Sequence, residues 1–499
     1  MAGQAIALKD EAATERLGAD LALALREGDC VLLSGDLGAG KTTLARGLVR
    51  QIAGDPGLEV PSPTFAFCHV YDTTPAVSHF DLYRLGAENE AGELGIGEAT
   101  GIVLVEWPQR APGALPAGAV EVRLEDRAGG GRVAHVSCAA NADLAARIGR
   151  SLAARDFLVR AGRGNDRRRN LQGDASTRRY ETVQGEGDRL ILMDAPRRPD
   201  GPPVKDGKPY SRIAHLAEDV VPFAALARVL DERGFAAPRV LAADFSAGFL
   251  LLEHLGESTL LTGDGKPDAA RYREAALLLA ELHRHSWPHR IEVADLNGDR
   301  RTHRLPAYDR EALAMEASLL ADWYAPHVSG RPLEEAARAE FAALWDGLIG
   351  ELADAPPTLV LRDYHSPNLI WRGERAFPAN IGLLDFQDAV IGPDAYDVAS
   401  LAQDARVDIG EELERDLVAA YVGARGAEFD AQAFARRYAI LAAQRATKIL
   451  GIFVRLNLRD GKPAYLRHIP RLHAYLARSL RHPVLARYRD WYERHAATR

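Results

Sequence analysis

Two phosphate-binding motifs of unrelated kinds occur in this 499-residue chain, and together they constrain its fold more than any other feature. The first is "SGDLGAGKTT" at 34–43, which fits G-x-x-x-x-G-K-[ST] after an apolar run and before a helical pattern. The second is "LRDYHSPNLIW" at 361–371, which spaces an Asp, a His and an Asn as in a phosphotransferase catalytic loop. Each motif belongs to its own kind of fold, so the sequence predicts two domains with one nucleotide site each.

Composition and charge place the chain among ordinary globular proteins. Apolar residues make up 47% and charged residues 26%, and the net charge of −8 argues against nucleic-acid binding as the main role of the whole chain. Cys30, Cys68 and Cys138 are too scattered for a disulfide framework or a metal knuckle. The N-terminus has no apolar signal-peptide region, and no run of 18 apolar residues predicts a membrane span. We therefore expect a cytoplasmic protein without membrane contact.

The order of helical and alternating patterns indicates where the two domains lie. Residues 1–150 combine a helical pattern at 11–27, a short apolar strand at 30–35 and a hairpin pattern around a Gly-Gly-Gly turn, which predicts an α/β P-loop NTPase domain. Residues 166–499 predict an α+β, two-lobed domain with the order expected of a kinase-like phosphotransferase. Its small, mainly β lobe is expected at about 166–256 and its large helical lobe at about 257–499. We expect a linker at 151–165.

Five arginines near the expected linker allow two interpretations. Arg160, Arg163, Arg167, Arg168 and Arg169 could form a basic stripe for tRNA or could belong to a solvated linker. Sites for single-stranded nucleic acid combine basic residues with stacking aromatic rings, and no aromatic residue is interleaved with this cluster. The solvated linker is therefore the preferred interpretation.

The first motif has the chemistry of a triphosphate site. Gly35, Gly38 and Gly40 allow backbone N–H groups to turn inward around phosphates at the start of a helix. Lys41 can neutralise the β and γ oxygens, and the Thr42 hydroxyl can reach Mg²⁺. ATP and Mg²⁺ are the expected cofactors.

Two acidic residues that end apolar segments are candidates for the metal and the attacking water. Asp81 lies in "HFDLYRL" and Glu106 in "IVLVEWP". A lone acid at a strand end is usually a cap or a surface residue, but two of them behind a P-loop predict a functional pair.

The P-loop is followed by three further motifs, "VPSPTFAF" (60–67), "HFDLYRL" (79–85) and "VLVEWP" (103–108). With the P-loop, they resemble the TsaE family over about the first 140 residues. TsaE proteins are small ATPases of the bacterial machinery that makes threonylcarbamoyladenosine at position 37 of tRNA. The resemblance implies ATP hydrolysis that resets transferase subunits of the TsaD/TsaB type, with tRNA involved only indirectly.

The same resemblance assigns roles to individual residues of the first domain. It implies Asp81 as a Mg²⁺-linked carboxylate, Thr64 as a switch-like contact, and Glu106 with Trp107 in the hydrolytic centre. The candidate nucleotide contacts are Gly35, Gly38, Gly40, Lys41, Thr42, Thr43, Thr64 and Trp107; Thr42 and Asp81 are the candidate metal ligands, and Glu106 is the candidate catalytic residue.

The second motif has the spacing of a kinase catalytic loop. Asp363 can orient an acceptor hydroxyl, and Asn368, five residues later, can hold Mg²⁺. Asp385 follows an apolar strand in "IGLLDFQDA" and is the candidate second metal ligand. His365 could contact the acceptor or tie down the loop, and the structural role is preferred. Three later acids, Asp388, Asp394 and Asp397, are expected to brace loops and cap helices.

The motifs of the second half resemble the aminoglycoside phosphotransferase/choline kinase superfamily. "GDASTRRY" (173–180), "LILMDAP" (190–196), "RVLAAD" (239–244) and "FLLLEHLG" (249–256) add a closer resemblance to the AmgK type of cell-wall sugar kinase. That type phosphorylates the anomeric hydroxyl of N-acetylmuramate and N-acetylglucosamine in peptidoglycan recycling. The resemblance implies Asp363 as base and Asn368 and Asp385 as Mg²⁺ ligands. It also implies phosphate contact near Ser176 and adenine contact at Glu253 to Leu255.

Two departures from the kinase pattern concern the phosphate site. Leu361 stands two residues before Asp363, where kinases usually have His, and "LILMDAP" has no Lys where the phosphate-pairing Lys is expected. Lys205, Lys208 and Arg179 are candidates for the missing positive charge, and the sequence does not choose among them.

The leading hypothesis is a bifunctional enzyme, an ATP hydrolase joined to a sugar kinase with an alcohol group as acceptor. One alternative makes the first domain a nucleotide-switched assembly module. Others make the second domain a non-catalytic kinase fold, or a kinase for an aminoglycoside, choline or another small hydroxyl compound. A phosphorylation screen over these acceptors distinguishes the kinase hypotheses.

Overall fold

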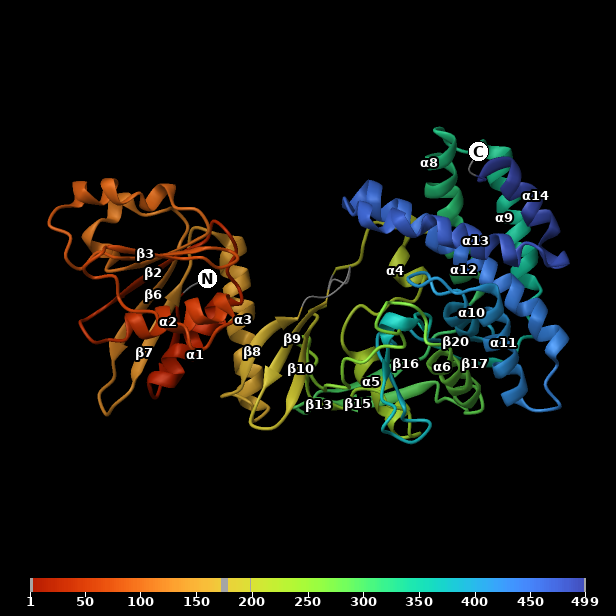
Figure 1. Ribbon diagram of the computed structural model, residues 1–499, viewed down its shortest axis with the longest axis horizontal. Coiled ribbons are helices and arrows are strands. Elements are labelled where there is room, and N and C mark those ends of the chain that lie inside the picture. Colours follow the sequence, from red (N-terminus) through yellow and green to blue (C-terminus); the bar gives the residue numbers. More distant parts are fainter. Residues whose placement is uncertain (1–2, 172–177, 198, 498–499) are drawn as a thin grey trace. The chain divides into compact units, whose positions relative to one another are not determined.

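The structure is a computed structural model that describes residues 3–171, 178–197 and 199–497 (Figure 1). It contains two compact units, Met1–Asp194 and Ala195–Arg499. Of the helices described, none is both long and apolar enough for a membrane span.

A seven-stranded sheet with the order β1-β7-β6-β2-β5-β4-β3 forms the centre of the first unit. The strands are β1 (Gln4–Leu8), β2 (Cys30–Gly35), β3 (Cys68–Tyr71), β4 (Val77–Asp81), β5 (Ile102–Glu106), β6 (Val120–Asp126) and β7 (Arg132–Ser137). The inner strands β4, β5, β2 and β6 run parallel, whereas β3 and β7 pair antiparallel with their neighbours. Strands β4 and β5 are buried throughout; β5 accordingly reads as an apolar run up to Glu106, whereas β4 buries polar residues, among them His79 and Asp81.

Two helices, α1 (Glu11–Ala22) and α2 (Lys41–Ala53), pack against each other beside this sheet. Their backbones cross so closely that a Cβ atom on Gly18 would lie 2.1 Å from the carbonyl oxygen of Leu44, and one on Gly47 would lie 2.0 Å from that of Glu15. Both crossing positions therefore require glycine. This contact anchors the helix that begins at the phosphate loop.

A third helix, α3 (Ala142–Arg160), and three antiparallel strands complete the first unit. The strands are β8 (Arg167–Leu171), β9 (Arg179–Gln184) and β10 (Arg189–Asp194). Helix α3 occupies residues 151–160, which the sequence assigns to a linker. Arg168 is 2% exposed and makes ion pairs with Asp20 and Glu181, so the prediction of a solvated linker is wrong at this residue. The polar, non-periodic sequence around Arg168 therefore forms the edge strand β8, and the charge of Arg168 is neutralised inside the fold.

The second unit begins with short strands and continues mainly as helices. Its strands are β11 (Pro203–Lys205), β12 (Lys208–Pro209), β13 (Val240–Asp244), β14 (Phe249–Glu253), β15 (Arg290–Ala294), β16 (Arg300–Arg304), β17 (Pro357–Val360), β18 (Leu369–Trp371), β19 (Ile381–Leu383) and β20 (Val390–Pro393). Its α-helices are α4 (Tyr210–Ile213), α5 (Val221–Asp231), α6 (Ala269–Leu282), α7 (Arg310–Leu319), α8 (Ala325–Ser329), α9 (Glu335–Gly350), α10 (Tyr396–Ala402), α11 (Glu411–Arg425), α12 (Ala431–Asp460), α13 (Ile469–Ser479) and α14 (Ala486–His495).

Helices pack on one another in the second unit, which also contains short antiparallel strand pairs. The 30-residue helix α12 contacts α7, α10 and α13, and the pairs β17–β20 and β18–β19 carry the predicted catalytic loop between them. A β-rich segment followed by a helical one is the order that the sequence predicts.

Candidate functional sites

The phosphate loop lies between the end of β2 and the start of α2. Gly35 has a φ of +139°, and a Cβ atom there would lie 2.4 Å from the carbonyl oxygen of Leu124. Gly40, the residue before the helix, has a φ of +99° in the left-handed region. The loop path therefore requires glycine at both ends, and it leaves the first N–H groups of α2 available for an anion.

Lys41 is folded back over its own loop. Its ammonium group donates hydrogen bonds to the carbonyl oxygens of Gly35 (2.9 Å) and Asp36 (2.8 Å) and lies 3.8 Å from the ring centre of Trp107. Burial lowers the pKa of Lys41, and the carboxylates of Glu106 and Asp81 oppose this shift. A group held by neutral carbonyls and an indole ring can be released to phosphate oxygens, which are stronger partners for it.

The two predicted acids are neighbours at one edge of the sheet. Asp81 and Glu106 are register partners at the ends of the parallel strands β4 and β5, and both are 2% exposed. The Thr42 hydroxyl donates to Glu106 at 2.9 Å, and the Thr64 hydroxyl donates to Asp81 at 2.7 Å. Four predicted residues from four chain segments therefore meet in one site.

Two further residues complete this site and were missed by the sequence analysis. His79 is fully buried with its Nε2 3.0 Å from Glu106, and the Ser62 hydroxyl donates to the same oxygen of Asp81 as Thr64 does. His79 stands two residues before Asp81 on β4, so strand alternation could have placed both on one face.

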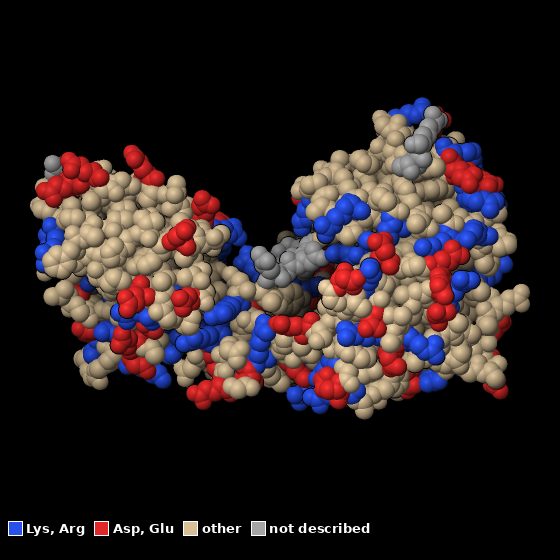
Figure 2. Space-filling view, viewed as in Figure 1, with Lys and Arg blue, Asp and Glu red and all other residues tan. Residues whose placement is uncertain are grey.

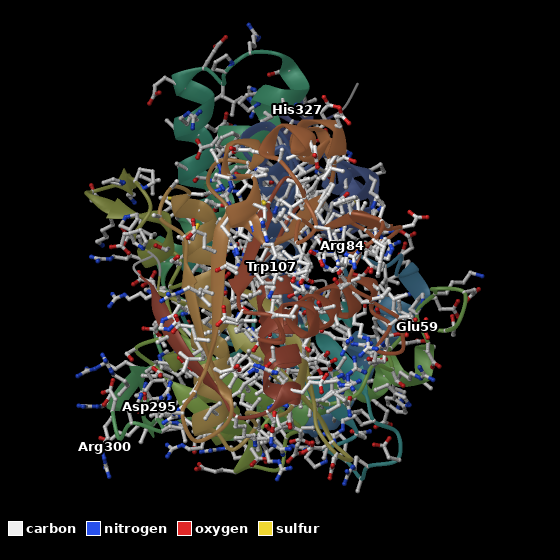
Figure 3. The ribbon with its side chains drawn as sticks, turned by 90° about the vertical axis from the view of Figure 1, so that its left-hand side faces the viewer. Glu59, Arg84, Trp107, Asp295, Arg300 and His327 are labelled. Atoms are coloured by element: carbon white, nitrogen blue, oxygen red, sulfur yellow. The ribbon has the colours of Figure 1, made fainter. Side chains whose placement is uncertain are left out.

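Trp107 and its neighbours form the outer part of the site. Trp107 has a φ of 61° and lies directly after β5, and its ring is 5.0 Å from that of Tyr83. Arg84 stacks on the 80% exposed Phe65 with 4.1 Å between guanidinium carbon and ring centre. Figure 3 shows Trp107 and Arg84 on the same face of this unit. Thr43 follows Thr42 in the first turn of α2.

The second candidate site is built where β18 and β19 pair. Asn368 directly precedes β18, Asp385 follows β19, and the N–H of Leu384 donates to the carbonyl oxygen of Asn368 at 2.9 Å. The Asn368 side-chain amide donates to the backbone carbonyl of Asp363 at 3.0 Å. Antiparallel pairing thus brings the three predicted residues to one edge, with the Asp363 side chain 46% exposed.

His365 is part of the catalytic loop, and its side chain is largely buried. Its side chain is 12% exposed, with Nε2 4.0 Å from a carboxylate oxygen of Asp363. Burial lowers the pKa of His365, so the neutral ring is favoured near pH 7. A buried neutral ring at this distance fits the structural role that the sequence analysis prefers.

Of the three later acids, Asp397 braces the catalytic loop, whereas Asp388 and Asp394 bind other segments, and helix α10 has no side-chain cap. Asp397 accepts from the N–H groups of Leu361 and Arg362, and Asp388 accepts from the N–H of Ala217 at 2.6 Å. Asp394 forms a two-bond ion pair with the Arg437 guanidinium, with both distances 2.9 Å.

A buried charge cluster behind the catalytic loop was not foreseen. Arg362 has a φ of 72°, is 3% exposed and donates to Glu316 on α7, which also accepts from Lys448 of α12 at 2.8 Å. Burial favours the neutral form of Glu316, but the charges of Lys448 and Arg362 lower its pKa to about 2. This cluster fixes the residue before Asp363. No local sequence pattern predicts the contact between Arg362 and Glu316, which are 46 positions apart.

Comparison with known proteins assigns both halves. The family model described as threonylcarbamoyl adenosine biosynthesis protein TsaE matches residues 8–133, and that described as phosphotransferase enzyme family matches residues 167–439, which is more than half of the chain. The N-acetylmuramate/N-acetylglucosamine kinase of Caulobacter vibrioides is 37% identical over 68% of this chain and 94% of its own length. The tRNA threonylcarbamoyladenosine biosynthesis protein TsaE of Rickettsia felis is 39% identical over 24% of this chain and 70% of its own length.

The chain belongs to both families. Its TsaE part and its phosphotransferase part belong to the two ATP-using families that the motifs predict. The predicted fold classes are confirmed. Among solved structures, the ethanolamine kinase of Plasmodium vivax is 13% identical, covers 67% of this chain and 90% of its own, and has a TM-score of 0.45.

Of the remaining predicted nucleotide contacts in the phosphotransferase part, the structure describes Glu253 and Leu255. Leu255 packs on β19, because a Cβ atom added to Gly382 would lie 2.9 Å from it; Glu253 at the end of β14 pairs with Arg239. Both precede the pair of strands that carries Asn368 and Asp385. Ser176 lies outside the described residues.

The structure also distinguishes the three candidates for the positive charge that the strand β10 lacks. Lys205 and Lys208 lie on the exposed β11–β12 hairpin, where Lys208 pairs with Glu311 at 3.1 Å. Arg179 begins β9 directly opposite Asp194 of β10. Of the three candidates, Arg179 is therefore the one on the strand that pairs with β10, where the lysine is lacking.

The donor atoms of both sites fit Mg²⁺. Asp81 and Thr42 in the TsaE part, and Asn368 and Asp385 in the phosphotransferase part, offer only carboxylate, hydroxyl and amide oxygens, the ligands that this ion prefers. The described residues contain no cluster of three or more His, Cys, Asp or Glu suited to a metal. Mg²⁺ usually takes one or two protein oxygens and completes its shell with phosphates and water, which agrees with so small a donor set.

A cavity of about 550 Å³ in the second unit lies elsewhere. It is lined by α5, β13 and β15 and includes none of Asp363, Asn368 and Asp385. Its volume alone does not make it the active site.

Proposed function

We propose that the phosphotransferase part transfers the γ-phosphoryl group of ATP to the anomeric hydroxyl of N-acetylmuramate or N-acetylglucosamine. The observation that carries this proposal is the meeting of Asp363, Asn368 and Asp385 at one edge of β18–β19, in a chain that spans 94% of a relative with that name. We place this domain at 166–499, the TsaE domain at 1–150, the short connection at 151–165, and the protein in the cytoplasm.

Asp363 is the catalytic base of this proposal. Its exposed carboxylate accepts the proton of the sugar hydroxyl while the new oxygen–phosphorus bond forms and the bond to the departing ADP oxygen breaks. Asn368 and Asp385 would hold Mg²⁺, which supplies charge neutralisation when bound. The backbone around Glu253 to Leu255 would meet adenine, and the segment at Ser176 would cover the phosphates.

For the TsaE part we propose ATP hydrolysis that acts on transferase subunits of the TsaD/TsaB type during tRNA modification. Lys41 exchanges its loop carbonyls for phosphate oxygens, and Glu106 orients the attacking water. Thr42 and Asp81 would hold Mg²⁺. The buried pair of His79 and Glu106 keeps that carboxylate in place.

One acceptor screen tests the kinase proposal. Full-length protein is incubated with ATP, Mg²⁺ and N-acetylmuramate, N-acetylglucosamine, an aminoglycoside or choline, and the phosphate transferred to each acceptor is measured, with acid lability identifying a sugar 1-phosphate. We expect phosphate on the two amino sugars and a loss of at least about 100-fold in Asp363→Asn, since a positioned base contributes at least that factor. Phosphate on choline or the aminoglycoside alone would refute the sugar assignment, and no product with bound ATP would favour a non-catalytic kinase fold.

A second experiment separates ATP turnover from a nucleotide-switched assembly role in the TsaE part. ATP hydrolysis is measured with and without the transferase subunits, using Asp363→Asn protein to silence the kinase part. We expect turnover that depends on the subunits and is lost in Lys41→Ala. Nucleotide-dependent association without turnover would favour the assembly role.

A further inference from the structure

An arginine-rich cavity of about 320 Å³ lies within the first unit, and its lining includes none of the candidate nucleotide contacts. Its walls come from α1, the C-terminal end of α2 and strand β8. Six arginines line it: Arg16, Arg50, Arg155, Arg167, Arg168 and Arg169. In Figure 2, Lys and Arg side chains gather over the region between α1 and β8.

The acidic residues that line this cavity are already paired. The two Asp20 oxygens accept from Arg155 at 2.8 and 2.9 Å, and one of them also accepts from Arg168 at 3.0 Å. Glu15 lies 3.4 Å from both Arg46 and Arg50. The two carboxylates therefore compensate the charges of their own partners and leave the other arginines of the cavity without compensation.

Three of the lining arginines have no counter-ion among the residues that the structure describes. In the described parts of the chain, no carboxylate oxygen lies within 4.0 Å of the guanidinium nitrogens of Arg16, Arg167 or Arg169; Arg169 donates only to the backbone carbonyl of Gly54, at 3.3 Å. Like charges brought together on one wall raise the electrostatic free energy unless an anion joins them. Such a wall is stabilised by an anionic ligand.

We infer that this cavity binds the phosphate group of a phosphorylated ligand. Guanidinium groups present planar forks of N–H donors that match phosphate oxygens in pairs, and the cavity uses arginine throughout and no lysine. The same chemistry serves a phosphodiester of RNA and a small phosphate monoester. The ligand would contact the end of α2, the helix that begins at the phosphate loop, and β8, the first strand of the segment matched by the phosphotransferase family.

The test uses the full chain with both nucleotide sites saturated by a non-hydrolysable ATP analogue and Mg²⁺. Inorganic phosphate, ribose 5-phosphate and unmodified tRNA are titrated into wild type and into the triple variant Arg16→Gln/Arg167→Gln/Arg169→Gln. A matched control, Arg127→Gln/Arg290→Gln/Arg487→Gln, removes the same charge from exposed positions outside the cavity.

We expect the triple variant to bind at least one probe about tenfold or more weakly than wild type and the control do, because several charge-assisted hydrogen bonds are lost. Tighter binding of ribose 5-phosphate than of inorganic phosphate identifies a small ester, and a selective loss of tRNA binding identifies RNA. Equal affinity of wild type and triple variant for every probe, or no saturable binding by wild type, overturns the proposal. Within the described ranges the three side chains have no buried ion-pair partner, so circular dichroism is expected to show an intact fold.

Discussion

Arg168 of β8 and Asp20 of α1 form a buried ion pair with 3.0 Å between guanidinium nitrogen and carboxylate oxygen. Asp20 lies in the segment matched by the TsaE family and Arg168 in the segment matched by the phosphotransferase family, so the two families meet inside the first unit. The Gln51 side chain at the end of α2 also donates to the carbonyl oxygen of Arg168 at 2.9 Å. The junction is a packed, hydrogen-bonded interface.

We predict that Asp20→Asn destabilises the first unit by about 3 kcal/mol, because it leaves Arg155 and Arg168 without their shared counter-ion in a buried place. The measurement is urea unfolding of the full chain at pH 7. Asp55→Asn, an exposed change outside this network, is the control and should shift the midpoint little. An unchanged midpoint in Asp20→Asn would show that the ion pair does not stabilise the junction.

Glu106→Gln should lower ATP turnover by the TsaE part by about 100-fold while nucleotide binding persists. The amide can still accept from Thr42, but it lacks the charge that orients and polarises water. Turnover in the presence of the transferase subunits and binding of a fluorescent ATP analogue are measured side by side in the Asp363→Asn background. Full turnover in this variant would remove Glu106 from the hydrolytic centre.

Asp397→Ala should weaken the kinase part through the position of its catalytic loop. The carboxylate accepts from two successive N–H groups directly before Asp363, and their loss leaves both unpaired in a buried place. We expect kcat to fall more than tenfold with the KM for ATP changed less than threefold. An equal rise in KM with kcat retained would assign Asp397 to substrate binding instead.

The ion pairs of Glu316 predict an acid-sensitive kinase part. Its pKa, lowered to about 2 by Lys448 and Arg362 against the effect of burial, lies below that of an unfolded glutamate, so its contribution to stability is complete above about pH 4.5 and is lost as the pH falls toward 2. Glu316→Gln should lower the free energy of unfolding by about 3 kcal/mol at pH 7 and should remove this part of its pH dependence. Urea unfolding at pH 7, 5 and 3, followed by tryptophan fluorescence, measures both effects; parallel pH profiles of variant and wild type would contradict them.

Residues close to a motif were predictable from the sequence, because local geometry fixes them. Parallel strands end at the same edge of a sheet, so Asp81 and Glu106 were expected at one edge, and the pairing of β4 with β5 makes them register partners. Loop spacing likewise placed Asp363 beside Asn368.

Long-range charge pairs were not predictable in this way. Arg168 and Asp20 are 148 residues apart, and a single sequence contains no signal for such a pair. The polar composition around Arg168 indicates solvent, although its charge is neutralised inside the fold by two acids. The same holds for Arg362, whose left-handed backbone and contact with Glu316 depend on the packing of α7 and α12.

The most direct test of the account is the number of nucleotides that one full-length chain binds. Calorimetric titration with a non-hydrolysable ATP analogue and Mg²⁺ should give two sites per chain. Lys41→Ala should remove one of them and Asp385→Ala the other. A single site in the wild-type chain, or one variant that abolishes both, would contradict the claim that two independent phosphate-binding devices operate in this protein.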